Sequence, residues 1–440
     1  MSREIRKAVV LTIRTIQWSS NSRLVQMEVA ITRARLGRSS RFPVLALTLA
    51  SWVAPPPDAA AQQQSSRDQP FFGVTTDGEL IPDLFPIRAT GVSTAPIVEA
   101  ARAYLRMLRP EQAAQTNFGL DSDEWRHWSN VPVGGLPRRG LSFRDMSDPQ
   151  REAAFALVRA GLSARGFEQA RNIMRIDGYL AAVLEDYQAY GEYLYFMDIF
   201  GEPSDTEPWG WQLDGHHLVV NYFVMGDQVV MSPNFWGSEP VSVDTGRYAG
   251  VEVLQEEQDV GLAFMESLRR DQRQIAIVDA AKPRNNLRGA AFRDNLVSEE
   301  AGIRGDQLNA AQRERLMDVI GVYVGAMRDD QARVRMEEVR GYLDETRLAW
   351  IGDVGPDALY YYRVQSPVIL IEFDHTVPVS FPTAERQPSR THIHIAVRTP
   401  NGNDYGKDLL RQHYEQHADD PGHVHGPPPA AGSRSGLGNR

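Results

Sequence analysis

The chain has 440 residues, of which 42% are hydrophobic and 24% charged, a composition typical of a globular protein with a sizeable core. It contains no cysteine, which excludes disulfides, thiolate metal ligands and a cysteine nucleophile. Its net charge of −10 argues against nucleic acid and anionic membrane surfaces as partners.

The first 61 residues differ in composition from the rest of the chain. They hold nine Lys or Arg against three acidic residues, and an apolar run at 42–54 is followed by the small residues of "PPPDAAAQ". This order is typical of a secretory signal, and the apolar run is too short to span a bilayer comfortably. We predict that residues 1–61 are a signal segment, with Met27 as an alternative start, and that the mature protein is periplasmic or secreted by a bacterium, without a stable membrane span. A membrane anchor or a buried core segment is the alternative.

Helices and strands are then expected in blocks. The apolar spacing predicts helices at 93–110, 147–166, 166–187, 251–271 and 306–347, the last as two helices, and a short one in "NDYGKDLLRQHYEQH". Strands are predicted in "EYLYFMDIFG", "HHLVVNYFVMGDQVVMSP", "ALYYYRVQ", "VILIEFDHT" and "THIHIAVR".

This block order predicts an α+β fold, with a mostly antiparallel sheet packed against a helical layer. We expect one main domain at residues 62–418 and a disordered tail at 419–440, which is rich in Pro, Gly and Ser. No internal repeat is evident in the sequence.

The segment "THIHIAVR" carries the clearest candidate site. Alternate residues of a strand share a face, so His392, His394 and Arg398 point one way. The Cα atoms of the two histidines are about 7 Å apart along the strand, a spacing that suits a metal held between two imidazole rings. The alternative is two histidines on the solvated face of a half-buried sheet.

The segment "VILIEFDHT" places Glu372 and Asp374 on one face of a strand. If it pairs antiparallel with the previous segment, one register sets Asp374 opposite His392 and Glu372 opposite His394. Two histidines and a carboxylate suit zinc or non-haem iron, and they equally suit an acid/base pair. A cross-strand ion pair at the surface is the alternative.

The pair His216–His217 follows Gly215, which lets a ligand or another backbone approach closely. On a strand, adjacent histidines point apart, so at most one of them is expected in any one site. Three tryptophans near this pair are candidates for an aromatic wall, although packing in the core is the commoner use of the residue: Trp209, Trp211 and Trp236.

A further histidine pair lies in "HYEQH". His413 and His417 are one helical turn apart, a spacing found for two zinc ligands on a helix. The glutamate stands at the third position and not at the second, so the metalloprotease motif is absent. A histidine that interacts with the carboxyl end of its helix is the alternative.

The stretches "WGWQLDGHHLVVNYFVMGDQVVMSPNFWGSEP" and "HIHIAVRTPNGNDYGKDLLRQHYEQH" resemble a mainly bacterial family catalogued as domain of unknown function 3500. The resemblance covers about residues 95–417. It implies a single domain, often exported, with the "GHH" and "HIH…R…NDYG" segments as hallmarks, and so draws attention to Asp404. It implies no activity.

The chain has no Gly-x-Ser-x-Gly elbow, P-loop or strand-linked Gly-x-Gly-x-x-Gly. These absences argue against serine hydrolases, nucleotide-dependent enzymes and dinucleotide oxidoreductases. Our leading hypothesis is an exported metal-dependent hydrolase of a small-molecule substrate. His392 and His394 would hold a divalent metal, zinc or alternatively iron or copper, with His217, its neighbour or His413 as a third ligand.

The other candidate residues receive supporting roles in this hypothesis. Glu372 or Asp374 would be a further ligand or the general base, Arg398 would bind an anionic group, and Asp404 is a further catalytic candidate. His216 and the three tryptophans would bind substrate. The alternatives are an oxidoreductase with a redox-active metal, a non-catalytic protein that binds a small molecule or sugar, and a metal-free acid/base enzyme.

Overall fold

The computed structural model describes residues 8–9, 33–34 and 69–419. Residues 8–9 and 33–34 form two short antiparallel strands, β1 (Ala8–Val9) and β2 (Arg33–Ala34), in a unit separate from the main body. The rest of the predicted signal segment and residues 420–440 of the predicted tail lie outside the described residues. Among the helices of the described ranges, none is long and apolar enough to cross a membrane.

In residues 69–419, one sheet of 13 strands forms the centre of the body. Its strands are β3 (Asn117–Phe118), β4 (Leu141–Ser142), β5 (Tyr195–Phe200), β6 (Trp209–Gly215), β7 (Leu218–Met225), β8 (Gln228–Val230), β9 (Asn234–Ser238), β12 (Ile277–Asp279), β13 (Ile303–Arg304), β14 (Arg347–Gly352), β15 (Tyr360–Gln365), β16 (Leu370–His375) and β17 (Ile393–Arg398). The order is β12-β14-β15-β16-β17-β9-β7-β6-β5-β3, with β13, β4 and β8 beside β14, β5 and β7. Only the pairs β3–β5 and β12–β14 are parallel, so the predicted α+β class with a mostly antiparallel sheet is confirmed.

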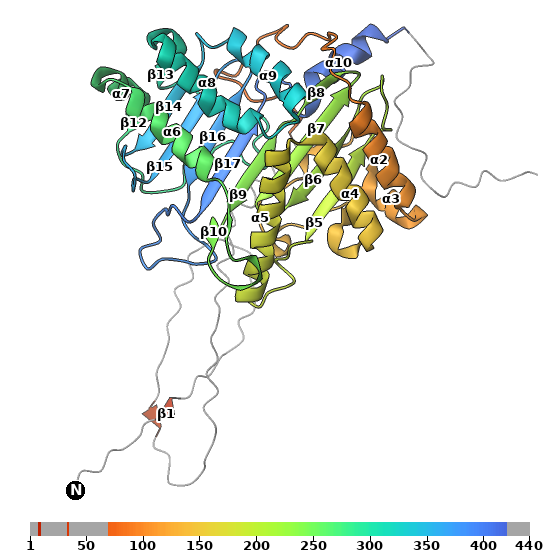
Figure 1. Cartoon of the computed structure of the whole chain (residues 1–440), viewed down its shortest axis with the longest axis horizontal. Coiled ribbons are helices and arrows are strands. Elements are labelled where there is room, and N and C mark those ends of the chain that lie inside the picture. Colours follow the sequence, from red (N-terminus) through yellow and green to blue (C-terminus); the bar gives the residue numbers. More distant parts are fainter. Residues whose placement is uncertain (1–7, 10–32, 35–68, 420–440) are drawn as a thin grey trace, which may run out of the picture. The chain divides into compact units, whose positions relative to one another are not determined.

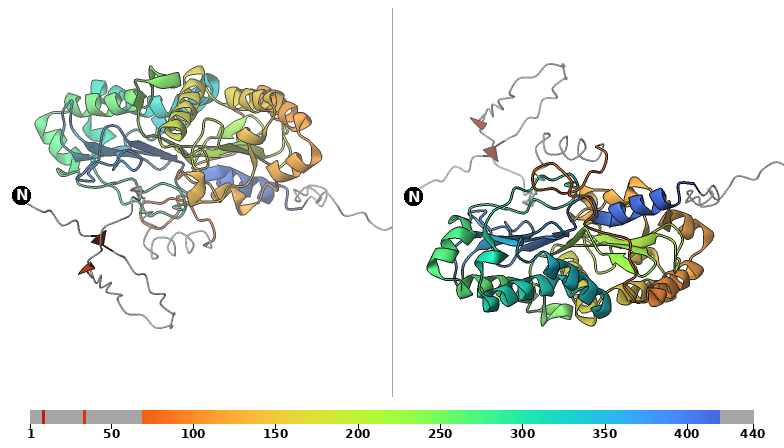
Figure 2. Two further views of the ribbon diagram at one scale, coloured as in Figure 1. Left: turned by 90° about the horizontal axis from the view of Figure 1, so that it is seen from below. Right: turned by 90° about the horizontal axis from the view of Figure 1, so that it is seen from above.

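Helices cover one face of this sheet, and loops cover the other. The helices are α2 (Ala95–Met107), α3 (Pro110–Thr116), α4 (Asp148–Gly161), α5 (Ala164–Val183), α6 (Gln255–Ser267), α7 (Arg270–Ala276), α8 (Ala310–Val324), α9 (Asp329–Gly341) and α10 (Lys407–Gln416). Figure 2 shows the helices of the α2–α9 series on one side of the sheet, and α10 with long loops on the opposite side. A short separate pair, β10 (Ser242–Val243) and β11 (Val251–Glu252), follows β9.

Both faces of the sheet are buried, and β7 accordingly reads as a nearly continuous apolar run. Every residue of β7 is buried. On the helical face, Trp211 stacks on Tyr222 with ring centroids 5.0 Å apart. On the loop face, Phe235 packs in a smaller aromatic cluster with Trp125 and Tyr405. Most side chains in the middle of this sheet are therefore shielded from bulk water on both sides.

The arrangement of the strands is symmetric about the centre of the sheet, which reveals an internal duplication. Strands β3, β5, β6, β7 and β9 correspond to β12, β14, β15, β16 and β17, and β9 pairs with β17 at the centre (Figure 1). Each half runs in the same order through two helices, short strands, two further helices and four main strands. No repeat is evident in the sequence, and the correspondence between the halves is one of strand order and helix placement.

Buried glutamines show the same duplication at the level of side chains. In the first half, Gln150 Nε2 at the start of α4 donates to Gln112 Oε1 of α3 at 2.8 Å. In the second half, Gln272 Nε2 of α7 donates to Gln312 Oε1 of α8 at 3.0 Å. All four glutamines also accept from the backbone amide three residues earlier, and so each caps its own helix. The same glutamine contact therefore joins the corresponding helices in both halves.

Candidate metal centre

Three histidines converge where β17, β9 and the β6–β7 turn meet. The Nε2 atoms of His392 and His394 lie 2.9 Å apart, and those of His394 and His217 lie 3.2 Å apart. Together they form a group that is capable of holding a metal ion. The structure thus brings together three of the four predicted metal ligands and joins the "GHH" and "HIH" segments in space.

Glycine at position 237 makes room for one of these rings. His394 pairs across the sheet with Gly237 of β9 on one side and with Asp374 of β16 on the other. A Cβ atom on Gly237 would lie 3.0 Å from Cδ2 of His394. The glycine therefore lets the imidazole lie against the neighbouring backbone, a use of glycine within a strand that the sequence did not single out.

The register assumed between the strand that carries Glu372 and Asp374 and the strand that carries His394 was wrong. Asp374 pairs with His394, and Glu372 pairs with Ala396, which shifts the pairing by two residues from the register considered. An even shift keeps each side chain on its face, because side chains alternate with a period of two. The carboxylates thus share the face of the histidines, but each lies opposite a different residue from the one assumed.

The two adjacent histidines lie in a turn and not along a strand. His217 has a left-handed backbone with φ of 61°, and the rings of His216 and His217 stack with centroids 3.8 Å apart. The expectation that these rings point apart was therefore wrong, although only His217 joins the metal-binding group. The turn is held by His217 N, which donates to Asn130 O at 3.2 Å, and by His217 O, which accepts from Gly237 N at 2.7 Å.

His216 is held beside the centre by a carboxylate of the helical layer. Its Nδ1 lies 2.6 Å from Asp177 Oδ1 of α5, and the other oxygen of Asp177 accepts from Gly191 N at 2.8 Å. The ring of Tyr190 packs edge-on to His216 at 5.2 Å. Since Asp177 is 39 residues away in sequence, no local pattern pointed to it.

Burial keeps the three histidines of the group neutral. It lowers the pKa of His217 and of His394 well below the usual value, and neighbouring histidines lower both further. Burial also lowers the pKa of His392, against the opposing effect of Glu239. Neutral imidazole is the form that binds a metal. His394 is half-buried, whereas the other two are buried, so His394 is the most exposed of the three.

The protonated nitrogen of His392 follows from its partner. Nδ1 of His392 lies 2.9 Å from the carbonyl oxygen of Val377. A carbonyl can only accept, so Nδ1 carries the proton and Nε2 keeps its lone pair. This lone pair points at the other two rings.

Glu372 and Asp374 direct their carboxylates away from the histidines and into the loop 282–289. Glu372 accepts from the amides of Arg288 and Gly289 and, at 2.6 Å, from the hydroxyl of Tyr361. Asp374 accepts from the amides of residues 286 and 287 and pairs with Lys282 at 2.9 Å. Burial raises the pKa of Asp374 to about 6, with Lys282 opposing the rise. Their roles as ligand or general base stay predictions, because the structure does not bring them to the histidine group.

Arg398 is fully buried and engaged on all sides. Its Nη1 lies 2.8 Å from Asp294 and 3.2 Å from Asp404, and its other nitrogens donate to the carbonyls of Gly289 and Ala290. Burial opposes its charge, but Asp404 and Asp294 outweigh burial and raise its pKa. Burial raises the pKa of Asp404 to about 6, against Arg398. The predicted catalytic roles of Arg398 and Asp404 stay untested, and neither residue reaches the histidines.

The three tryptophans of the predicted aromatic wall belong to the main hydrophobic core. Trp209 and Trp211 are completely buried in the main core, and Trp236 is almost so. Trp236 also donates from Nε1 to Asn234 Oδ1 at 2.9 Å. These contacts are those of core residues, and substrate binding by the tryptophans stays a prediction.

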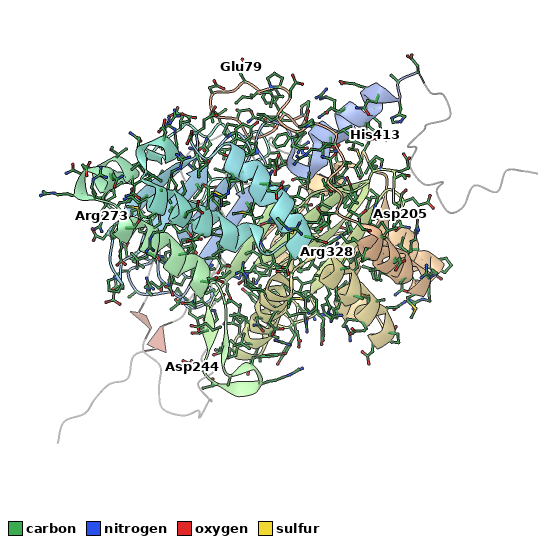
Figure 3. All side chains as sticks on the ribbon, turned by 45° about the horizontal axis from the view of Figure 1, so that its top comes forward. Glu79, Asp205, Asp244, Arg273, Arg328 and His413 are labelled. Atoms are coloured by element: carbon green, nitrogen blue, oxygen red, sulfur yellow. The ribbon has the colours of Figure 1, made fainter. Side chains whose placement is uncertain are left out.

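His413, the fourth predicted ligand, lies on α10 (Figure 3). Its Nε2 is 3.7 Å from Glu207, and its ring lies 4.6 Å from that of His417. It does not belong to the group of three histidines. A ligand role for His413 would need a site other than this group.

Comparison with known proteins identifies a family. A model described as "Protein of unknown function (DUF3500)" matches residues 90–407. The chain belongs to this family. Among curated proteins and among solved structures, nothing matches.

The DUF3500 match contains the whole candidate centre. The three histidines of the group lie within residues 90–407, whereas His413 lies beyond them. Two carboxylates also lie within the match, Glu239 beside His392 of the centre and Asp177 beside the adjacent His216, and both were missed in the sequence. Neither stands near a histidine in the chain, so only the folded arrangement reveals them.

Proposed function

We propose that this DUF3500 protein is a metal-dependent hydrolase that holds a divalent metal, zinc foremost, at His217, His392 and His394. The observation that carries the proposal is the convergence of three neutral imidazoles on one point. Three protein ligands leave a fourth position for water or substrate, as in catalytic zinc sites. Export to the periplasm or the exterior, and a small-molecule substrate, belong to the same proposal.

The distances between the nitrogens fit such an ion. Zinc–nitrogen bonds of about 2.0–2.1 Å in a tetrahedron place ligand nitrogens about 3.3 Å apart. The pairs at 2.9 and 3.2 Å need to open by only a few tenths of an ångström. Nε2 of His392 keeps its lone pair, and the Nε2 atoms of His394 and His217 lie close enough to join it as ligands of one ion.

The surrounding residues orient the centre. Bound zinc would supply a water whose pKa is lowered to near 7. Val377 fixes His392 with Nε2 toward the ion. Asp177 holds the proton of His216 on Nδ1, so that Nε2 of His216 keeps a lone pair for a proton released beside the centre.

The same three imidazoles would accept iron or copper, which keeps a redox role as the alternative within the proposal. The metal that co-purifies with the protein, and that restores activity after removal, separates the two. A hydrolase works with zinc, whereas an oxidoreductase needs the redox-active ion.

A second candidate function is the binding of a small molecule without catalysis. A cavity of about 390 Å³ lies between the sheet and α8–α9, away from the histidines. It is lined by the hydroxyls of Ser232 and Thr399 and by both apolar and charged side chains, with Val229 and Val334 among the apolar ones and Arg335 and Glu338 among the charged ones. This volume is within the range of small-molecule sites.

Hydrolysis is tested with a panel of nitrophenyl esters, phosphoesters and amides. The zinc-loaded protein should cleave at least one class, and both a chelator and His394→Ala should abolish the activity. His413→Ala is the matched control and should keep it. A protein that holds zinc at the three histidines but cleaves no member of the panel would argue against a hydrolase and in favour of binding.

A further inference from the structure

Glu239 is a buried carboxylate that touches a ligand of the centre from behind. It follows β9 directly and is 2% exposed. Its Oε2 lies 3.4 Å from Nδ1 of His392, the nitrogen that faces away from the other two rings. Nδ1 also donates to Val377 at 2.9 Å, so the same proton faces a carbonyl and a carboxylate.

The same carboxylate holds the loop between β16 and β17. The amide of Val379 donates to Oε2 of Glu239 at 3.0 Å, and the amide of Phe381 donates to Oε1 at 2.8 Å. The side chains of Val379 and Phe381 are 74% and 38% exposed, so apolar packing contributes little to keeping this part of the loop in place. The two bonds to Glu239 are therefore its main anchor on this side.

The loop also reaches the other side of the centre. Ser380, between the two anchored residues, lies beside the hydroxyl of Tyr190, where burial raises the pKa and Ser380 opposes the rise. The ring of Tyr190 packs edge-on to His216, which stacks on His217. Three successive loop residues thus contact groups beside the centre: Glu239, which touches His392, and Tyr190, which touches His216.

We propose that Glu239 is a positioning residue that couples the loop 376–391 to the metal centre, so that metal binding and closure of this loop stabilise each other. The inference rests on the metal site proposed above and adds a mode of regulation to it. A metal on Nε2 of His392 withdraws electron density from the ring and makes Nδ1–H a stronger donor. The stronger contact orders Val377 and Glu239, and with them the amides of the loop.

Coupling of this kind is reciprocal. If the metal stabilises the closed loop, then a closed loop must stabilise the bound metal by the same free energy. Weakening the loop anchor therefore lowers the affinity for zinc, even though no ligand atom changes. This reciprocity gives the proposal two independent readouts.

Three variants separate the coupling from damage to the loop. Glu239→Gln keeps the size of the side chain, but removes its charge and one of its two acceptors. Val379→Pro removes one donor to Glu239 and leaves the carboxylate and His392 intact. Ala384→Pro is the matched control, since it places proline in the same loop at the second position of the turn that Arg386 N closes on Thr383 O, where proline is favoured.

The experiment measures zinc affinity by competition with a chelating indicator, and hydrogen exchange of residues 376–391 with and without zinc, in the full-length chain. We expect Glu239→Gln to weaken zinc binding by about 10- to 100-fold, Val379→Pro to weaken it less, and Ala384→Pro to leave it unchanged. Zinc should slow exchange at the amides of Val379 and Phe381 in the wild type, but not in Glu239→Gln. Comparison of Ala384→Pro with the wild type shows whether an added proline in this loop is tolerated.

The outcomes distinguish the two proposals. A wild-type protein that binds no zinc removes the metal site itself. A wild-type protein that binds zinc with loop exchange unchanged, together with a Val379→Pro variant of normal affinity, overturns the coupling and leaves the metal site standing. Val379→Pro makes this distinction even if Glu239→Gln fails to fold.

Discussion

Gly237 and His394 are cross-strand partners at the centre of the sheet, and the absence of a Cβ on the glycine is what gives the imidazole its place. Gly237→Ala would put a carbon 3.0 Å from Cδ2 of His394 and equally close to Ile393 O. We expect a loss of about 1–3 kcal/mol in the free energy of unfolding, as for other overpacked sites, and weaker zinc binding because the ring must shift. Urea unfolding and a zinc titration measure the two effects.

Gly341→Ala is the control for this substitution, because a Cβ there meets nothing within 4 Å and the residue ends α9. It should leave zinc binding unchanged. Normal zinc affinity in Gly237→Ala would show that the position of His394 does not depend on the glycine.

Asp177→Asn tests the carboxylate behind His216. The amide keeps the shape of the side chain but no longer holds the proton on Nδ1 of His216 by charge. We expect the zinc content to be unchanged and the rate of hydrolysis to fall by about 10²- to 10⁴-fold, the usual contribution of a proton-transfer group. Metal analysis and the ester panel are run on the same sample. A variant that keeps its full rate would remove His216 from the mechanism.

Arg398→Met tests whether this arginine is structural. The substitution leaves Asp404 buried without its cation, whereas Asp294 keeps its ion pair with Arg126 at 2.8 Å. We expect a loss of about 3–5 kcal/mol in the free energy of unfolding, with normal zinc content in the protein that remains folded. Denaturant unfolding gives the first quantity. Unchanged stability with a loss of substrate binding would instead support the anion-binding role predicted from the sequence.

The pH dependence of stability should carry the signature of buried neutral histidine. Burial lowers the pKa of His375 to about 3, and its ring accepts from Tyr360 N at 3.1 Å and contacts Gln258 Oε1 at 2.9 Å. In the unfolded chain His375 binds a proton below about pH 6.5, whereas in the folded chain it stays neutral down to about pH 3. The stabilising contribution is therefore present above pH 6.5 and is lost as the pH falls from 6.5 towards 3.

His375→Gln preserves an acceptor and a donor without a titrating ring. We expect its midpoint of urea unfolding to fall less between pH 7 and pH 5 than that of the wild type. Parallel slopes in the two proteins would show that His375 is not the group responsible.

The sequence predicted the parts of the centre that depend on local geometry. Strand alternation placed His392 and His394 on one face, and the structure confirms that they meet. The same argument placed Arg398 on that face, but alternation says nothing about burial, and Asp294 lies 104 residues away. Alternation could not reveal the register error either, since a shift by two residues leaves every side chain on the same face.

Other parts required the fold itself. His217 reaches the centre because its backbone is left-handed, a conformation that few non-glycine residues adopt and that strand alternation cannot foresee. Asp177 and Glu239 come from distant elements. The internal duplication was hidden because what the halves share is topology and a few glutamines, such as Gln112 and Gln272, which are common residues at helix starts.

The metal content of the full-length, untagged protein tests the central claim most directly. Elemental analysis by mass spectrometry should find about one equivalent of zinc, iron or copper per chain, absent in His394→Ala and retained in His413→Ala. No stoichiometric metal after reloading with each of these ions, or equal retention in His394→Ala, would contradict the account.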